Sequence, residues 1–326
     1  MAEILNDTID FRQYLKETDT KTKVKRASDY VSVIKSRLRE KKNHKVNYLP
    51  WPKTNENFEF RKGEVTLWSG QNGHGKSLMT SQVALSLIGQ NEKVCVASFE
   101  MKPSVTLQRM ARMWIGCNPF SVEFQGKEGI DALDGLYDQF GDWTDNRMWL
   151  YDQMGTADSA TVIGMARYCA KELGITHVFV DNLAKCVKGE DDYNGQKQFV
   201  DELTSVARDY DMHIHLVHHL KKPANEHAIP DKHDNKGSGA ITDLVDNVML
   251  VFRNKAKEDS IKQQGEFAKQ NSDPDHYLLC RKQRNYEGSG EGEPTVKLWF
   301  HRDAQQYVAD PHDRPMFFPN YPHVAS

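Results

Sequence analysis

Two kinds of hydrophobic pattern alternate along most of the chain. Short runs rich in β-branched and aromatic residues recur from residue 64 to residue 300, and between many of them apolar residues are spaced three or four positions apart. The short runs predict β-strands, and the wider spacing predicts amphipathic helices. The predicted strands span residues 64–69, 93–99, 147–151, 176–181, 212–218, 247–252, 277–283 and 295–300. The predicted helices span residues 76–89, 103–116, 129–140, 158–173 and 196–210.

This alternation predicts an α/β fold with a mostly parallel, twisted sheet that is flanked by helices. The last two predicted strands are joined by the turn-forming segment EGSGEGEP at 287–294, so we expect them to form a C-terminal antiparallel hairpin. In sheets of this kind ligands bind at the carboxyl ends of the strands. The residues at those ends are therefore the first candidates for a functional site.

The two ends of the chain differ from the middle. Residues 1–57 are polar, with Lys and Arg crowded between 21 and 45, and we expect them to form an N-terminal arm. Within this arm, apolar residues at helical spacing predict a linker helix over 25–42, and the two prolines of 47–57 indicate a linker. The main domain then spans 58–309. Residues 310–326 contain four prolines, so we expect a flexible C-terminal tail.

Composition narrows the class of protein. Hydrophobic residues make up 38% and charged residues 27% of the 326 positions, which suits one large α/β domain with extensions. No run of 18 apolar residues occurs and the N-terminus is acidic, so neither a membrane span nor a signal peptide is expected. The five scattered cysteines form no C-x-x-C pair, which favours reduced thiols in a cytoplasmic protein. A net charge of −3 means that any contact with nucleic acid must use local patches.

The most specific motif is the phosphate-binding loop (P-loop) that follows the first strand of the main domain. It has the form G-x-x-x-x-G-K-S, and a predicted helix begins at its end. Glycines let the backbone N–H groups converge on phosphate oxygens, and the positive end of the helix points at the same anion. The lysine would reach the β- and γ-phosphates of ATP, and the serine hydroxyl would hold Mg²⁺. The candidate ATP-binding residues are Gly70, Gln71, Asn72, Gly73, His74, Gly75, Lys76 and Ser77.

Two carboxylates stand at the ends of other predicted strands. Asp181 follows the buried-type strand THVFVD, and paired with a P-loop this pattern favours a carboxylate that holds Mg²⁺ through water over a helix-capping residue. Glu100 follows the strand at 93–99, where it could orient a water molecule toward the γ-phosphate. Considered without the other motifs, however, a glutamate at such a place is more often an ordinary loop residue without a catalytic role.

The strand MHIHLVH and the next residue carry four histidines. His213 and His215 share one face of the strand while His218 falls on the other, and no Cys or carboxylate completes a ligand set. This spacing argues against a metal site. We expect His219, at the end of the strand, to face the γ-phosphate as a polar sensor.

Two basic stretches lie farther along the chain. The segment 221–238 is long and polar and has four lysines, which suits either contacts with polynucleotide phosphates or a solvated insertion. Lys282 and Arg284 share one face of a predicted strand. They could form a charge clamp for the nucleotide of a neighbouring subunit, and from composition alone a solvated strand face explains them better.

The order of these motifs resembles the DnaB family of ring-shaped replicative helicases, which includes phage primase-helicases. The segments GQNGHGKS, SFEM, VFVDN, HHLKKP, KGSGA and CRKQRN occur in that order between residues 58 and 307. The most specific parts are KGSGAITDLVDNVMLVFR at 236–253 and KQRN with the later TVKLWF at 295–300. The resemblance implies a RecA-like P-loop ATPase core and the activity of a DNA helicase.

The resemblance also implies a role for individual residues. Glu100 would be the catalytic base, Asp181 the Mg²⁺-linked carboxylate and His219 the residue that couples nucleotide state to the DNA loops. Arg284 would be an arginine finger in the adjacent subunit's site, with Lys282 beside it. Residues expected to touch the phosphates of single-stranded DNA are Lys221, Lys222, Lys236, Gly237 and Gly239. Residues expected to flank the adenine are Arg253 and Phe300.

The implied protein is a homo-hexamer that hydrolyses ATP with Mg²⁺ and moves 5′ to 3′ on single-stranded DNA during replication. The first 57 residues are too short for the helical collar of DnaB or for a zinc-binding primase. Priming and loading would then fall to a separate primase, loader or polymerase, which the tail could dock. This fits a phage-type helicase in the cytoplasm of a bacterial host. Two alternatives remain, a RecA-type filament-forming recombinase and a P-loop ATPase without a role on DNA.

Overall fold

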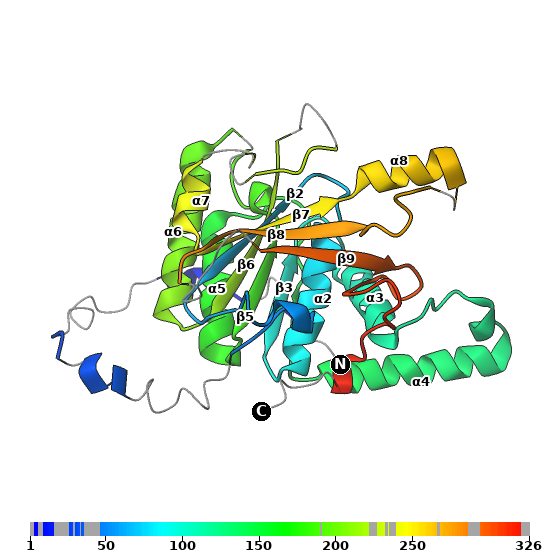
Figure 1. Ribbon diagram of the computed structural model, residues 1–326. Coiled ribbons are helices and arrows are strands. Elements are labelled where there is room, and N and C mark those ends of the chain that lie inside the picture. The colour runs from blue at the N-terminus through cyan, green and yellow to red at the C-terminus, as the bar shows by residue number, and fades with distance from the viewer. Residues whose placement is uncertain are drawn as a thin grey trace.

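In the part of the chain that the structure describes, ten strands form one sheet with helices on both faces (Figure 1). The strand order is β1-β4-β3-β5-β6-β2-β7-β8-β9-β10. The computed structural model describes residues 3–5, 9–15, 26–28, 30–32, 34–35, 46–189, 191–221, 227–231, 234, 239–265, 268–285 and 294–320. The α/β fold with a mostly parallel sheet is therefore confirmed.

The centre of the sheet is parallel, and its C-terminal end is antiparallel. The parallel central strands are β2 (Val65–Gly70), β3 (Val94–Ser98), β4 (Met148–Tyr151), β5 (His177–Asp181), β6 (His213–His219) and β7 (Asn247–Arg253). Each predicted strand begins and ends within one residue of the observed one. The antiparallel strands that follow are β8 (His276–Gln283), β9 (Thr295–His301) and β10 (Gln306–Val308). The predicted hairpin corresponds to β8 and β9.

Alternating side chains of the strands build two separate cores. On β3, Cys95 and Ala97 face one core while Val94 and Val96 face the other, as the two-residue period of a strand requires. The first core is covered by α5 (Ser159–Leu173), α6 (Tyr193–Asp209) and the short α7 (Ala240–Leu244). The second is covered by α2 (Lys76–Gly89), α3 (Pro103–Ile115) and α4 (Gly126–Thr144). These two groups of helices lie on opposite sides of the sheet in Figure 1, and α8 (Lys255–Gln264) extends beyond it.

The N-terminal residues contribute to the main domain more than the sequence predicted. Strand β1 (Glu3–Leu5) pairs in parallel with β4 at the edge of the sheet, and the 3₁₀ turn Phe11–Leu15 packs on α5. Of the predicted helix over 25–42, residues 30–32 and 34–35 are helical, and the rest of that range lies mostly outside the described residues. The exposed apolar side chains of this helical part are Tyr30, Val31 and Ile34.

The prediction of a linker over 47–57 is wrong. Leu49 and Trp51 are buried in the second core, and the Trp51 indole N–H donates to the Tyr307 carbonyl at 2.8 Å. Pro52 begins a 3₁₀ turn that ends at Thr54 rather than an extended spacer. The large apolar side chains of Leu49 and Trp51, on either side of Pro50, decide the outcome, because their burial outweighs the tendency of prolines to mark a loop.

The prediction of a flexible tail is wrong for the part that the structure describes. Phe318 is fully buried within the second core, in a 3₁₀ turn over Phe318–Asn320. The Met316 N–H donates to the Gln306 side chain at 2.6 Å, and the Gln306 amide donates back to the Met316 carbonyl at 3.1 Å. Residues 321–326 lie outside the described residues.

His215, one of the histidines of β6, belongs to a buried hydrogen-bonded chain. The Trp68 indole N–H donates to His215 Nδ1 at 3.2 Å, so the hydrogen of His215 is on Nε2 and is donated to His177 Nδ1 at 3.1 Å. The Asn47 side-chain amide meets His177 Nε2 at 3.0 Å. These hydrogen bonds tie the N-terminal segment to the sheet.

No helix within the described parts of the protein is long and apolar enough to cross a membrane.

Candidate nucleotide-binding site

The P-loop connects the end of β2 to the start of α2, and its glycines are required by shape. A Cβ on Gly70 would lie 2.6 Å from the Val251 carbonyl oxygen, which is too close for any side chain. Gly75 has a φ of +83°, and a Cβ there would meet the Tyr307 hydroxyl at 2.1 Å. The backbone can therefore curl tightly around an anion at this place.

His74, a loop residue whose type phosphate geometry does not dictate, anchors the P-loop to β7. Its side chain is buried, and Nδ1 accepts a hydrogen bond from the Arg253 backbone N–H at 3.2 Å. The Arg253 guanidinium donates to the Gly73 carbonyl at 3.3 Å and pairs with Glu258. The centroid of the Phe300 ring lies 5.3 Å from that of Tyr307, whose hydroxyl is close to Gly75 of the P-loop. Adenine contacts of Arg253 and Phe300 stay predictions.

Lys76 lies at the bottom of the loop and is buried. Its ammonium donates to the Gly70 carbonyl at 2.9 Å and to the Gln71 carbonyl at 3.0 Å. Burial lowers the pKa of Lys76 to about 8, against the opposing effect of the Asp181 and Glu100 carboxylates. A nucleotide phosphate in the loop would supply the negative charge that this buried cation needs.

Ser77 and Asp181 meet although they are 104 positions apart in the sequence. The Ser77 hydroxyl donates to Asp181 Oδ2 at 2.6 Å. Burial raises the pKa of Asp181 to about 6, while the hydrogen bond from Ser77 works in the opposite direction. A hydroxyl and a carboxylate beside a phosphate cradle are the oxygen donors that Mg²⁺ prefers, so these residues fit the ion. A cavity of about 460 Å³ opens above them and is also lined by Lys76, Glu100 and His219.

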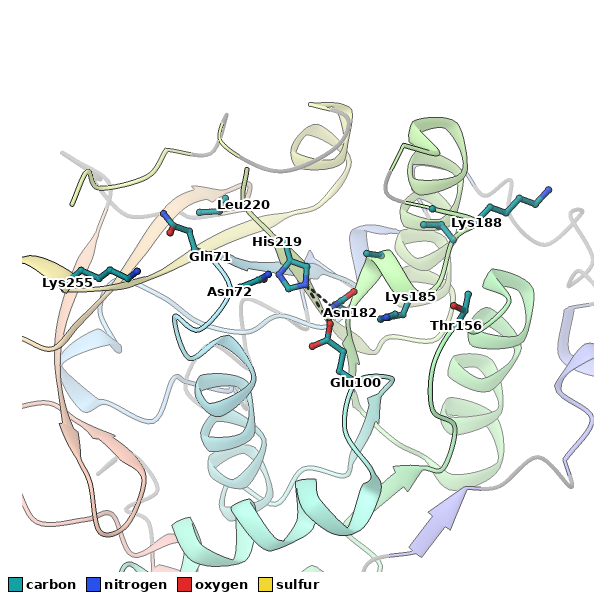
Figure 2. A pocket seen from close by; sticks show the side chains of 13 residues that line it. Gln71, Asn72, Glu100, Thr156, Asn182, Lys185, Lys188, His219, Leu220 and Lys255 are labelled. Atoms are coloured by element: carbon teal, nitrogen blue, oxygen red, sulfur yellow. Dashed lines mark hydrogen bonds and ion pairs between the residues drawn. The ribbon is translucent and has the colours of Figure 1, made fainter. Parts of the chain in front are cut away.

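Glu100 and His219 are joined by a residue that the sequence did not single out, Asn182. The Asn182 side-chain amide donates to Glu100 Oε1 at 2.6 Å and to His219 Nε2 at 2.9 Å. Figure 2 shows the three side chains converging at the wall of a second cavity of about 680 Å³. The expected base and the expected sensor are therefore adjacent, 3.7 Å apart at their nearest polar atoms.

The same cavity is lined by basic side chains that the sequence analysis did not predict to belong to the site. Lys185, Lys188 and Lys255 come from three separate positions around its rim (Figure 2). Of the predicted DNA contacts, Lys221 and Gly239 are exposed. Lys222, Lys236 and Gly237 lie outside the described residues.

Lys282 and Arg284 lie beside the amino-terminal ends of the parallel strands, whereas the P-loop follows the carboxyl end of β2. Strand β8 runs antiparallel to β7, so His276 pairs with Arg253 near the P-loop while Gln283 pairs with Asn247 at the start of β7. Six residues of strand separate these ends, roughly 20 Å. Arg284 pairs with the buried carboxylate of Asp246 at 3.2 Å.

The side chain of Lys282, on β8, binds the C-terminal end of α7 in its own subunit. Its ammonium donates to the carbonyls of Thr242, Asp243 and Val245 at 2.7, 2.9 and 2.8 Å. Backbone carbonyls at a helix C-terminus lack partners within the helix, and a cation satisfies them well. Neither Lys282 nor Arg284 is near its own chain's P-loop, and their action on a neighbouring site stays a prediction.

Comparisons with known proteins agree with this arrangement. A family profile described as an AAA domain matches residues 58–225. A DnaB-like replicative helicase, solved in a study of its interactions with primase, superposes with a TM-score of 0.67 at 13% identity, over 87% of this chain and 67% of that one. A second solved structure, an ATPase domain, superposes with a TM-score of 0.70 at 15% identity, over 87% of this chain and 99% of that one. The chain therefore belongs to the AAA domain family, and its fold is that of the DnaB-like replicative helicases.

Proposed function

We propose that this protein is an ATP-dependent DNA helicase that forms a hexameric ring and moves 5′ to 3′ on single-stranded DNA during replication. The observation that carries the proposal is that the expected catalytic residues lie at opposite ends of the strands of one sheet. The P-loop, Ser77, Asp181 and Glu100 gather at the carboxyl ends of the parallel strands. Arg284 lies beside the other ends of these strands, too far away to reach a nucleotide in its own P-loop, which supports a role in the site of a neighbouring subunit.

The chemistry follows from these positions. The P-loop and Lys76 hold the phosphates, and Ser77 and Asp181 would hold Mg²⁺, which neutralises charge on the phosphate oxygens. Glu100 orients a water molecule for attack on the γ-phosphate. Arg284 of the neighbouring subunit stabilises the charge that develops on the transferring group, a contribution worth roughly 10³–10⁵ in rate in comparable enzymes.

Contact with DNA would come from loops repeated around the ring. The segment after His219 contains the predicted contacts Lys221, Lys222, Lys236, Gly237 and Gly239. Six copies of a few lysines can line one channel on a protein whose net charge is −3. Binding through phosphates should weaken steeply as salt rises and should depend little on base sequence. An affinity that is the same at low and moderate salt would argue against the channel.

A forked duplex with a free 5′ single-stranded tail tests the activity directly. We expect unwinding that requires ATP and the 5′ tail, and none with a 3′ tail alone. Filaments instead of closed rings in electron micrographs would favour a recombinase. ATP hydrolysis that is indifferent to DNA would favour an ATPase without a role on DNA.

Mixed rings test the divided site. Arg284→Ala should abolish turnover and leave nucleotide affinity nearly unchanged, while Lys76→Ala removes the P-loop cation. Mixing the two inactive variants should restore part of the activity, because some interfaces then combine an intact P-loop with an intact arginine. Mixed rings without any recovery would contradict a role of Arg284 in the neighbouring site.

A further inference from the structure

We propose that Asp246 is a positioning residue that directs the guanidinium of Arg284 toward the nucleotide of a neighbouring subunit. The inference rests on the proposed function, in which Arg284 acts on that nucleotide, and adds the residue on which this action depends. Asp246 directly precedes β7, at the amino-terminal ends of the parallel strands. It belongs neither to the P-loop nor to the residues expected to hold Mg²⁺ or water.

The carboxylate of Asp246 is buried and is fixed by the central sheet. Its side chain is 3% exposed, and Oδ2 accepts a hydrogen bond from the backbone N–H of Val65, the first residue of β2, at 3.0 Å. The Asp246 N–H donates to the Val65 carbonyl at 3.0 Å, and the Arg284 N–H donates to the Asp246 carbonyl at 2.9 Å. The backbone of Asp246 is thus bonded on both sides, and the position of its carboxylate follows from the strands.

The guanidinium of Arg284 takes its direction from this carboxylate. One terminal nitrogen donates to Asp246 Oδ1 at 3.2 Å, and the other donates to the Asp243 carbonyl at 2.6 Å. A guanidinium is planar and carries five N–H groups, so these two bonds fix its plane and use only part of its capacity to bind phosphate oxygens. The side chain of Arg284 is 40% exposed, so a ligand from outside the subunit can approach it.

A second arginine makes the charge of Asp246 important as well as its shape. Arg208, near the end of α6, lies 3.6 Å from the same oxygen, and its side chain is 55% exposed. Two guanidinium groups therefore approach one carboxylate oxygen. Without the negative charge these two cations would repel each other, and a half-exposed arginine has many other orientations available. The carboxylate is therefore needed to keep Arg284 in the orientation observed.

The backbone around Arg284 is held by residues on both sides of it. Lys282 binds three carbonyls at the end of α7, and the Asn285 amide donates to the buried carboxylate of Glu64 at 2.7 Å. Loss of the Asp246 carboxylate should therefore change the direction of the Arg284 side chain and leave its Cα in place. Such a defect affects the site that the arginine serves, which is expected to be the neighbouring one, and spares the P-loop of the same chain.

Mixed rings distinguish a misdirected arginine from a damaged subunit. In rings of one variant, Asp246→Asn should lower kcat on the order of a hundredfold, the effect of misplacing a catalytic group by about 1 Å, and should leave the affinity for a fluorescent ADP analogue unchanged. Mixing Asp246→Asn with Lys76→Ala should restore part of the activity, because the first variant keeps an intact P-loop and the second keeps a directed arginine. Mixing Asp246→Asn with Arg284→Ala should restore nothing, since every subunit then lacks a directed arginine.

Controls separate this role from a general role in folding. Arg208→Gln removes the other cation beside the carboxylate and should leave turnover unchanged. Melting temperatures identify variants that have lost the fold, and Asp246→Ser, whose hydroxyl can still accept from the Val65 N–H, gives the same comparison if Asp246→Asn is unfolded.

Two results would overturn the inference alone, while Arg284→Ala and Lys76→Ala still complement each other. One is full turnover in rings of Asp246→Asn, and the other is no recovery when that variant is mixed with Lys76→Ala in rings shown to contain both chains. Full turnover in Arg284→Ala would overturn the proposed role of Arg284 in the neighbouring site as well.

Discussion

Nucleotide binding at alkaline pH is expected to draw a proton onto Lys76. The ammonium is buried in the P-loop, where it donates to two backbone carbonyls, and its pKa is lowered to about 8 by burial. Phosphate oxygens would return this pKa toward the ordinary value of 10.5. The charged form is the one that binds, so a deprotonated lysine has to take up a proton from solvent.

The size of the effect follows from the pKa of about 8. About a tenth of the free protein has a neutral lysine at pH 7 and about nine tenths at pH 9. Proton uptake should therefore rise from about 0.1 to about 0.9 per nucleotide, and affinity should fall by about tenfold, or roughly 1.4 kcal/mol. The terminal phosphate, whose second pKa is about 6, releases about 0.1 proton at pH 7 and almost none at pH 9, so it cannot produce an uptake of about 0.9 at pH 9.

Isothermal titration calorimetry measures this uptake when the same binding is recorded in buffers of different ionisation enthalpy. ADP and a non-hydrolysable ATP analogue are suitable ligands at pH 7, 8 and 9. Lys76→Arg is the matched control, since a guanidinium stays protonated throughout this range and should abolish the uptake. Uptake in the wild type that is equal at pH 7 and pH 9, or that persists in the arginine variant, would refute the assignment to Lys76.

Three further predictions concern stability. Burial lowers the pKa of His213 to about 4, so the folded protein loses stability as the pH falls below 6.5, by about 2 kcal/mol at pH 5. In urea unfolding, His213→Gln should reduce the loss of stability between pH 7.5 and pH 5. Parallel pH profiles of the variant and the wild type, or the same reduction in the exposed-site control His312→Gln, would contradict this assignment. Trp51→Ala should lower the free energy of unfolding by about 3–5 kcal/mol if residues 47–57 belong to the core, and a value below about 1 kcal/mol would restore the linker interpretation. Lys282→Met should lower the free energy of unfolding by about 1–3 kcal/mol, because it removes the cation that binds three carbonyls at the end of α7. Lys262→Met is the solvent-exposed control. Equal stability of the two variants would argue against a stabilising role of Lys282 at the end of α7.

The strands of the sheet were predictable because parallel strands are buried on both faces. Such strands read as uninterrupted apolar runs with polar residues at each end, which fixes their limits in the sequence. Helices α7 and α8 escaped prediction for different reasons, since α7 has five residues and α8 is almost wholly polar. Strand β1, with three residues, has too little pattern to be recognised.

The P-loop was predictable and its surroundings were not. A loop whose shape depends on glycines leaves a local signature, whereas the Asn182 amide donates a hydrogen bond to Glu100 from 82 positions away. Its type carries no signal beyond its place after Asp181. The same holds for His74, whose partner is a backbone N–H 179 positions farther along the chain. Contacts of this kind are set by the order of the strands in the sheet, which the sequence alone did not provide.

Strand direction decides which nucleotide Arg284 can reach. Strand β7 runs parallel to β2 and ends near the P-loop, and β8 returns antiparallel beside it over seven paired positions. A parallel β8 would have carried Arg284 to the edge of the sheet where the P-loop lies. The antiparallel pairing carries it to the other edge, where Asp246 binds it and roughly 20 Å of sheet lie between it and the P-loop. No rotation of one side chain spans that distance, so a chain that is to use Arg284 in catalysis must receive it from a second copy.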